Sequence, residues 1–285
     1  MSPLRLDRLI TLYLARPLVR RRGVPVGWPI LMYHSISDGG AVGAHAYYET
    51  NTTPGRFREQ VRWLKDAGFH SVPLGAPAET AAQDKAVAIT FDDGYRDSLT
   101  RAWPVLRECG FGATVFLATD YVGSSFKGRA CLSWDEVRQG RREGIVFGSH
   151  TASHPELARL SDADVAHQWR ASKDRIEQEL GERIDLFSYP YAFPEACPAF
   201  VRRLRRILED SGYARGVTTI LGTVRDIKTE FFLPRLPVNS FDDNHLFRAK
   251  SEGAYNWLHN AQVLSKRVGR AIRRQDLRRD NPSPP

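Results

Sequence analysis

Short apolar segments alternate with amphipathic helices along most of the chain, and this alternation limits the fold more than any other feature. Six segments have the length and the apolar or β-branched content of buried strands. They span residues 29–36, 86–93, 113–118, 145–150, 186–189 and 215–219. Strands that alternate with helices usually form parallel sheets, so we predict an α/β protein, either a barrel or a doubly wound sheet.

The helices between these strands begin or end at typical capping residues. Thr53 with Pro54 opens the first, the capping box of Ser133 with Glu136 opens the second, Ser161 opens the third, and Gly212 ends the fourth. Their apolar stripes are those of helices that pack on a core, and we assign them no function.

The positive charge of the chain lies at its two ends. The formal net charge is +8, yet residues 1–22 contain six Arg against one Asp, and residues 266–285 contain seven Lys or Arg against two Asp. The remainder is therefore slightly acidic, and we expect no nucleic-acid partner. Basic ends suit contact with anionic lipid head groups, while solvated ends without any partner are an equally acceptable alternative.

These differences divide the chain into three predicted parts. Residues 1–24 form a basic amphipathic extension that either rests on a membrane surface or packs against the core. Residues 25–262 form the core domain, and residues 263–285 are expected to be a disordered tail. We find no apolar run of transmembrane length, no clear signal peptide and no C-x-x-C pair among three cysteines, so we expect a protein of the cytoplasm or the inner membrane face.

Two acidic residues directly follow a predicted strand. Asp92 and Asp93, in Thr-Phe-Asp-Asp-Gly, lie where a barrel strand gives way to its functional loop. Because successive strand residues point to opposite faces, the turn at Gly94 must redirect one carboxylate if both are to share a site. An Asp-Gly pair taken alone could be only a turn.

Two histidines follow another predicted strand. His150 and His154, in His-Thr-Ala-Ser-His, are expected on one face of a helical turn, close enough to bind the same cation. With a carboxylate from the neighbouring motif they make a ligand set of two His and one Asp, which leaves coordination positions for water and substrate.

Three segments in order resemble the first three motifs of the polysaccharide deacetylase family, also called NodB-like or carbohydrate esterase family four. They are Thr-Phe-Asp-Asp-Gly, His-Thr-x-x-His, and Phe-Ser-Tyr-Pro-Tyr at 187–191, and the resemblance covers about residues 28–255. It implies a distorted (β/α)7 barrel. It also implies one divalent metal ion, with zinc expected before other transition metals, and an N-acetylated glycan as substrate.

The resemblance further implies roles for individual residues. They are Asp92 as general base, Asp93, His150 and His154 as metal ligands, and Tyr191 with Pro190 beside the substrate, where a backbone N–H would stabilise the oxyanion.

The chain departs from the family pattern in two places. Ser188 stands where many members have an Arg that braces the catalytic Asp, and Arg235 on a late strand is our candidate for that role, against the alternative of a plain surface arginine. No Leu-x-His motif supplies a general acid near the C-terminus. His34 at the end of the first strand would reach the same rim in a closed barrel, and it resembles the acid of the permuted branch that acts on exopolysaccharide amino sugars.

The predicted function is metal-dependent hydrolysis of N-acetyl groups from amino sugars of a polysaccharide or its precursor, with release of acetate. The alternatives are another acyl substrate, such as an O-acetyl ester or peptidoglycan, and a non-catalytic carbohydrate-binding scaffold. Retention of Asp92 favours an enzyme, because a scaffold could lose the base and keep the metal.

Overall fold

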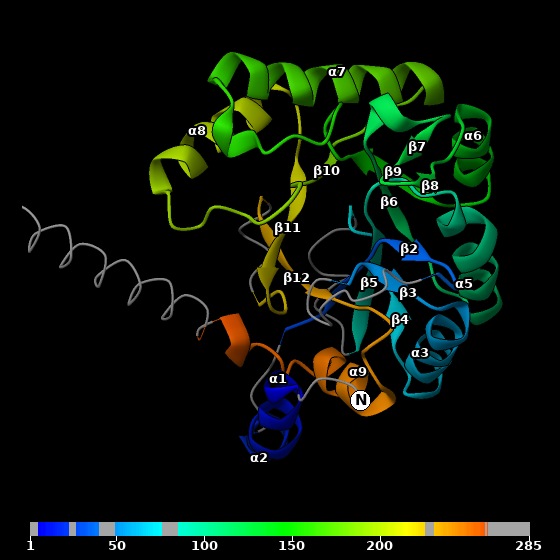
Figure 1. Cartoon of the computed structure of the whole chain (residues 1–285), viewed down its shortest axis with the longest axis vertical. Helices are drawn as coiled ribbons and strands as arrows, with labels where there is room; N and C mark the ends of the chain where they lie inside the picture. The colour runs from blue at the N-terminus through cyan, green and yellow to red at the C-terminus, as the bar shows by residue number, and fades with distance from the viewer. Residues whose placement is uncertain are drawn as a thin grey trace, which may run out of the picture.

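A closed ring of parallel strands forms the centre of the protein (Figure 1). The computed structural model describes residues 5–22, 27–39, 49–75, 85–225, 231–259 and 261. Within them, the ring follows the order β1-β12-β11-β10-β9-β6-β5, and β1 also pairs with β5. These strands are β1 (Ile30–Tyr33), β5 (Ala86–Phe91), β6 (Thr114–Leu117), β9 (Val146–Ser149), β10 (Leu186–Ser188), β11 (Arg215–Leu221) and β12 (Leu233–Pro237). Closure confirms the (β/α)7 barrel and excludes the doubly wound sheet.

Shorter strands lie beside the ring. They are β4 (His70–Ser71) against the start of β5, β2 (Ser35–Ile36) against β3 (Asn51–Thr52), and the hairpin of β7 (Ser125–Phe126) with β8 (Arg129–Ala130). The predicted strand 29–36 is divided between β1 and β2, and the other short strands were not predicted. The hairpin and the pair of β2 with β3 extend loops that leave the barrel, so they shape the space above its strand ends.

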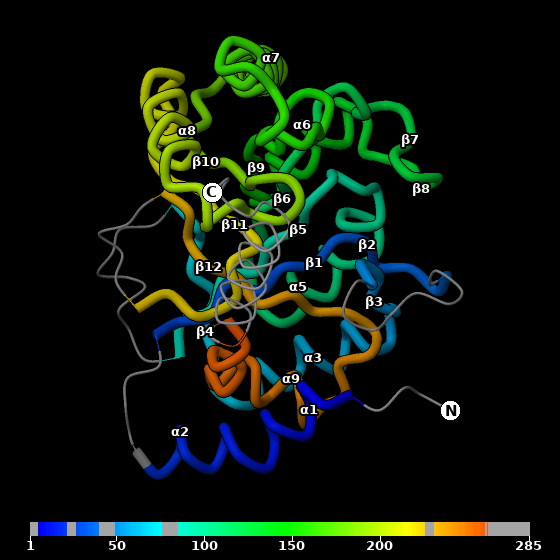
Figure 2. The backbone as a smooth tube through the Cα atoms, turned by 60° about the vertical axis from the view of Figure 1, so that its left-hand side comes forward, coloured from blue at the N-terminus to red at the C-terminus, as the bar shows by residue number. Residues whose placement is uncertain are grey.

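Helices cover the outside of the ring, as the backbone trace shows (Figure 2). They are α3 (Pro54–Asp66), α5 (Trp103–Cys109), α6 (Trp134–Arg142), α7 (Asp162–Leu180), α8 (Pro198–Asp210) and α9 (Asn244–Ser251). The predicted caps are confirmed: Thr53 and Ser161 accept backbone N–H groups of the first turns of α3 and α7, and Ser133 and Glu136 form the capping box of α6.

The strands separate two buried layers. Ile30, Ala88 and Phe116 belong to a cluster inside the ring, whereas Leu31 and Ile89, one residue along the same strands, belong to the larger cluster between strands and helices. This alternation follows from the two-residue period of a strand, and it fixes which side chains can reach the interior at the strand ends.

The N-terminal extension is helical and lies at the periphery, next to α9 (Figure 1). It consists of α1 (Leu6–Ile10), a π-helical turn (Thr11–Ala15) and α2 (Arg16–Arg22). No helix among the described residues is long and apolar enough to cross a membrane. The predicted tail at 263–285 lies outside the described residues.

Candidate active site

Two neighbouring strands deliver His34 and Asp92 side by side. Tyr33 pairs in register with Phe91, and the N–H of Asp92 donates to the carbonyl of Tyr33 over 3.0 Å. His34 and Asp92 are the next residues of β1 and β5, in phase with the interior positions Met32 and Thr90. Both side chains therefore reach the open end of the ring.

Asp93 reaches the same site because its backbone is redirected. Its φ is 68°, and Gly94 follows with a φ of 65°. A Cβ on Gly94 would lie 2.9 Å from Cδ2 of Leu117, so the left-handed turn needs a glycine for space as well as for its dihedral angle. Of the two carboxylates, Asp93 is the one that the turn redirects into the site. Its side chain is buried next to both histidines.

Asp93, His150 and His154 form a buried group with metal-ligand geometry. Oδ1 of Asp93 lies 3.6 Å from Nε2 of His150 and 3.3 Å from Nε2 of His154, and one ligand atom from each residue falls within 4.8 Å of the others. Ligand atoms at about 2.0–2.1 Å from a tetrahedral ion are about 3.3 Å apart. Among the described residues, Oδ1 of Asp93 has no hydrogen-bond partner, so a buried oxygen is available to a cation.

The two histidines are oriented differently. Nδ1 of His150 lies 2.7 Å from the carbonyl of Ser188, which favours a proton on Nδ1 and leaves the Nε2 lone pair free. Burial, assisted by the nearby His150, lowers the pKa of His154 to about 3. A neutral imidazole is the form that binds a metal ion. Because His154 is neutral, its 3.3 Å contact with Asp93 is not an ion pair.

The expected helical turn between the histidines is wrong. Thr151 and His154 have φ values of 69° and 54°, and the N–H of His154 donates to Oγ1 of Thr151 over 3.0 Å. Side-chain oxygens of this kind compete with helical hydrogen bonds, so the segment forms a tight loop instead. The loop still brings both rings together, with centroids 4.7 Å apart.

Arg235 clamps the carboxylate of Asp92. Its two terminal nitrogens donate to Oδ1 and Oδ2 over 2.8 and 2.7 Å, and further bonds reach Thr90, Ser188 and the carbonyl of Thr218. Arg235 is fully buried in the middle of β12, so the alternative of a surface arginine is excluded. Burial would raise the pKa of Asp92, but the charge of Arg235 outweighs it and lowers that pKa.

The remaining predicted residues occupy different places. His34 lines the cleft, and burial lowers its pKa against the opposing effect of Asp93 and Asp92. Tyr191 is 44% exposed at the rim, with its ring centroid 4.5 Å from that of His154. Pro190 is buried and does not line the cleft, unlike Tyr191.

One cleft of about 780 Å³ lies at the open end of the ring, and its lining contains the predicted residues His34, Asp92, Asp93, His150, His154 and Tyr191. Its wall also contains Glu49, Lys127 and Glu195, which the sequence did not single out. The ammonium of Lys127 lies 5.3 Å from the centroid of Tyr191. Isolated charged residues on loops carry no motif, so no signal in the sequence could have found them.

Large parts of the chain are similar to known proteins. Residues 79–215 match the model of the polysaccharide deacetylase family. YxkH of Bacillus subtilis (strain 168), which is named for this family, is 29% identical over 220 residues that cover 75% of this chain and 72% of its own. The poly-beta-1,6-N-acetyl-D-glucosamine N-deacetylase of Staphylococcus aureus (strain MSSA476) is 20% identical over 242 residues, 76% of this chain and 81% of its own.

The same fold occurs in a solved structure. Deacetylase PplD of Streptococcus pyogenes, in complex with acetate, superposes with a TM-score of 0.67 at 23% identity, over 80% of this chain and 99% of that one. At this identity the likeness establishes the shared fold.

Proposed function

The chain belongs to the polysaccharide deacetylase family, and from that premise we propose that it removes N-acetyl groups from amino sugars of a polysaccharide or its precursor, with zinc as cofactor. One observation carries the proposal. An ionised carboxylate, Asp92, is fixed by Arg235 next to the ligand set of Asp93, His150 and His154, at the floor of a single cleft.

The donor atoms fit a divalent ion. Two neutral imidazoles and one carboxylate are the ligands that zinc accepts in hydrolases, with positions left for water and substrate. An ion held by Asp93, His150 and His154 would supply a water molecule with a pKa lowered toward about 7 and would polarise the acetamide carbonyl.

Asp92 is assigned the proton-accepting step. Arg235 keeps the carboxylate ionised and fixes both oxygens, so it can take a proton from the water that attacks the carbonyl carbon. Negative charge then develops on the carbonyl oxygen, and a backbone N–H near Tyr191 is assigned to stabilise it.

His34 is assigned the proton-donating step. Its ring faces the cleft from β1, beside Asp92, and its lowered pKa makes it a strong donor once protonated. Proton transfer to the amide nitrogen lets the carbon–nitrogen bond break. Acetate leaves, and the sugar keeps a free amine.

We also place the protein in the cytoplasm or at the inner face of the membrane. This part of the proposal is supported by the basic ends and by the cysteines Cys109, Cys131 and Cys197, which are free thiols. We assign it a glycan substrate and no nucleic-acid partner.

The test compares acyl donors with the zinc-loaded protein. N-acetylglucosamine oligomers with β-1,4 or β-1,6 linkages should release acetate together with an equal amount of free amine. Acetate from an O-acetylated glycan, without amine from any oligomer, would favour the ester alternative. Oligomer binding without any acetate release would favour the scaffold.

A further inference from the structure

Large apolar side chains are exposed mainly on one segment, residues 6–22, which we call the N-terminal helix. Leu6, Tyr13, Leu14 and Leu18 are 64%, 70%, 61% and 51% exposed. Elsewhere in the described part of the chain, the same degree of exposure is approached only by Tyr191 at the cleft and by Phe241. Surface helices usually turn their apolar side to the core, but these four side chains lie largely outside it.

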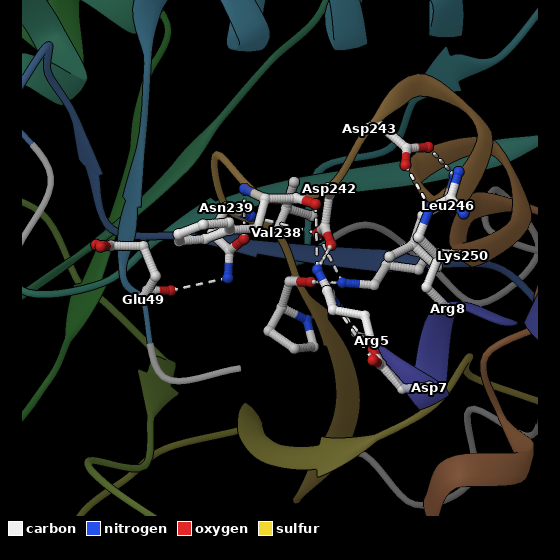
Figure 3. A network of polar contacts seen from close by, with 12 residues as sticks. Arg5, Asp7, Arg8, Glu49, Val238, Asn239, Asp242, Asp243, Leu246 and Lys250 are labelled. Atoms are coloured by element: carbon white, nitrogen blue, oxygen red, sulfur yellow. Dashed lines mark hydrogen bonds and ion pairs between the residues drawn. The ribbon is translucent and has the colours of Figure 1, made fainter. Parts of the chain in front are cut away.

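Polar residues at the start of the helix bond to the domain (Figure 3). The guanidinium of Arg5 lies 3.2 Å from the carboxylate of Asp242, and Arg8 donates to Asp243. Asp242 is itself buried and also accepts from Lys250 over 2.6 Å. These bonds fix the first turn of the helix to the loop between β12 and α9.

The second half of the helix is fixed in the same way. Arg16 donates two hydrogen bonds of 2.9 Å to the carboxylate of Glu252, which Arg20 also contacts. Between these points, Trp257 donates through Nε1 to Oγ1 of Thr11 over 3.0 Å. Contacts along the whole length therefore fix the rotation of the helix about its axis. This rotation keeps the exposed apolar side chains directed toward solvent.

The outward surface combines apolar groups with positive charge. Asp7 is the sole acidic residue between residues 6 and 22, and it is engaged by Arg5 and by the hydroxyl of Tyr255. Arg20 and Arg21 are exposed at the end of the helix. A second copy of this face would bring like charges together, whereas an anionic lipid surface offers phosphates for the arginines and an apolar layer for the leucines.

We propose that the N-terminal helix is a docking surface for an anionic lipid bilayer. Leu6, Tyr13, Leu14 and Leu18 enter the boundary between head groups and acyl chains, and Arg20 and Arg21 contact lipid phosphates. The ion pairs with the domain then determine how the barrel is oriented on the membrane. This inference does not depend on the proposed hydrolysis.

The experiment is sedimentation of the full chain with vesicles of phosphatidylglycerol and phosphatidylcholine, and with vesicles of phosphatidylcholine alone. The wild type should bind the anionic vesicles. The triple variant Tyr13→Ser, Leu14→Ser, Leu18→Ser should bind them at least tenfold more weakly, with an unchanged melting temperature. The control Arg58→Ser, Arg62→Ser removes two exposed charges from α3 and should bind like the wild type.

Several results would overturn the proposal. One is binding that the triple variant retains in full, because the basic residues 266–285 would then suffice. Another is absence of wild-type binding to anionic vesicles. A concentration-dependent dimer that the triple variant abolishes, without vesicle binding, would assign the face to a second copy of the chain.

Discussion

The guanidinium of Arg235 meets the carboxylate of Asp92 through two parallel hydrogen bonds of 2.8 and 2.7 Å, and both side chains are buried. The two residues come from β12 and from the end of β5, which lie on either side of β1. Because both charges are buried, removing either one leaves the other without its partner. The energetic coupling between the two residues can be measured.

Arg235→Met should lower the free energy of unfolding by about 3–5 kcal/mol, because it leaves a buried carboxylate without its partner. Adding Asp92→Asn to the same chain removes that charge, so the double variant should be more stable than Arg235→Met alone. Urea denaturation of the four proteins measures the coupling. Equal stability of Arg235→Met and the wild type would show that the ion pair between Arg235 and Asp92 contributes nothing to the free energy of unfolding.

Zinc should stabilise the wild type, since the proposed metal site exists only in the folded chain. At about one hundred times its dissociation constant the gain is about 2.7 kcal/mol, visible as a rise in melting temperature. Asp93→Ala and His154→Ala should lose the rise, while Asp92→Asn keeps it. An equal rise in all variants would place the ion elsewhere.

His34→Ala should lower turnover by about 10²–10⁴-fold and leave zinc affinity nearly unchanged, if the imidazole donates the proton. The matched control is His259→Ala. Nε2 of His259 lies 3.4 Å from a carboxylate oxygen of Glu195, which lines the cleft, and we expect a smaller loss there. A larger loss from His259→Ala would transfer the role to that residue.

Attachment of the N-terminal helix should weaken in acid. Burial raises the pKa of Glu252, but hydrogen bonds from Arg16 and Arg20 outweigh it, so the pKa lies below the ordinary 4.5. A carboxylate with a depressed pKa contributes stability above its unfolded value and loses it as the pH falls. Glu252→Gln should therefore cost about 1 kcal/mol at pH 7 and progressively less below pH 4.5.

The control for that series is Glu59→Gln, which removes an exposed partner of Arg56 on α3 and should change stability little at any pH. A cost of Glu252→Gln that stays constant from pH 7 to pH 3 would mean that its charge does not hold the helix.

Most strands of the ring could be predicted from apolar runs and from the caps of the helices between them. Strand β12 was harder to predict from the sequence. Its sequence, Leu-Pro-Arg-Leu-Pro, contains two prolines, which normally argue against a strand inside a sheet. In the structure Val217 pairs with Leu233 and Leu221 with Arg235, so a bulge in β11 lies opposite Pro234. The missing N–H falls where the ladder is interrupted, and tertiary pairing of this kind is not visible in one sequence.

The sequence motifs identified the side chains that the structure brings together. The local backbone conformation that places them could not be predicted from the sequence. Asp93, Thr151 and His154 adopt left-handed conformations that propensity disfavours and that surrounding contacts impose. Pro190 was assigned to the substrate by resemblance alone, and the structure places it outside the cleft lining.

The most direct test is acetate release from N-acetylglucosamine oligomers by the zinc-loaded wild type and by Asp92→Asn, with bound zinc quantified in both proteins. We expect release by the wild type that stops when a chelator removes the metal. We expect equal zinc content in Asp92→Asn with most of the activity lost, because the amide cannot accept the proton from water. Undiminished release by Asp92→Asn at equal zinc content would contradict the role of Asp92 as general base.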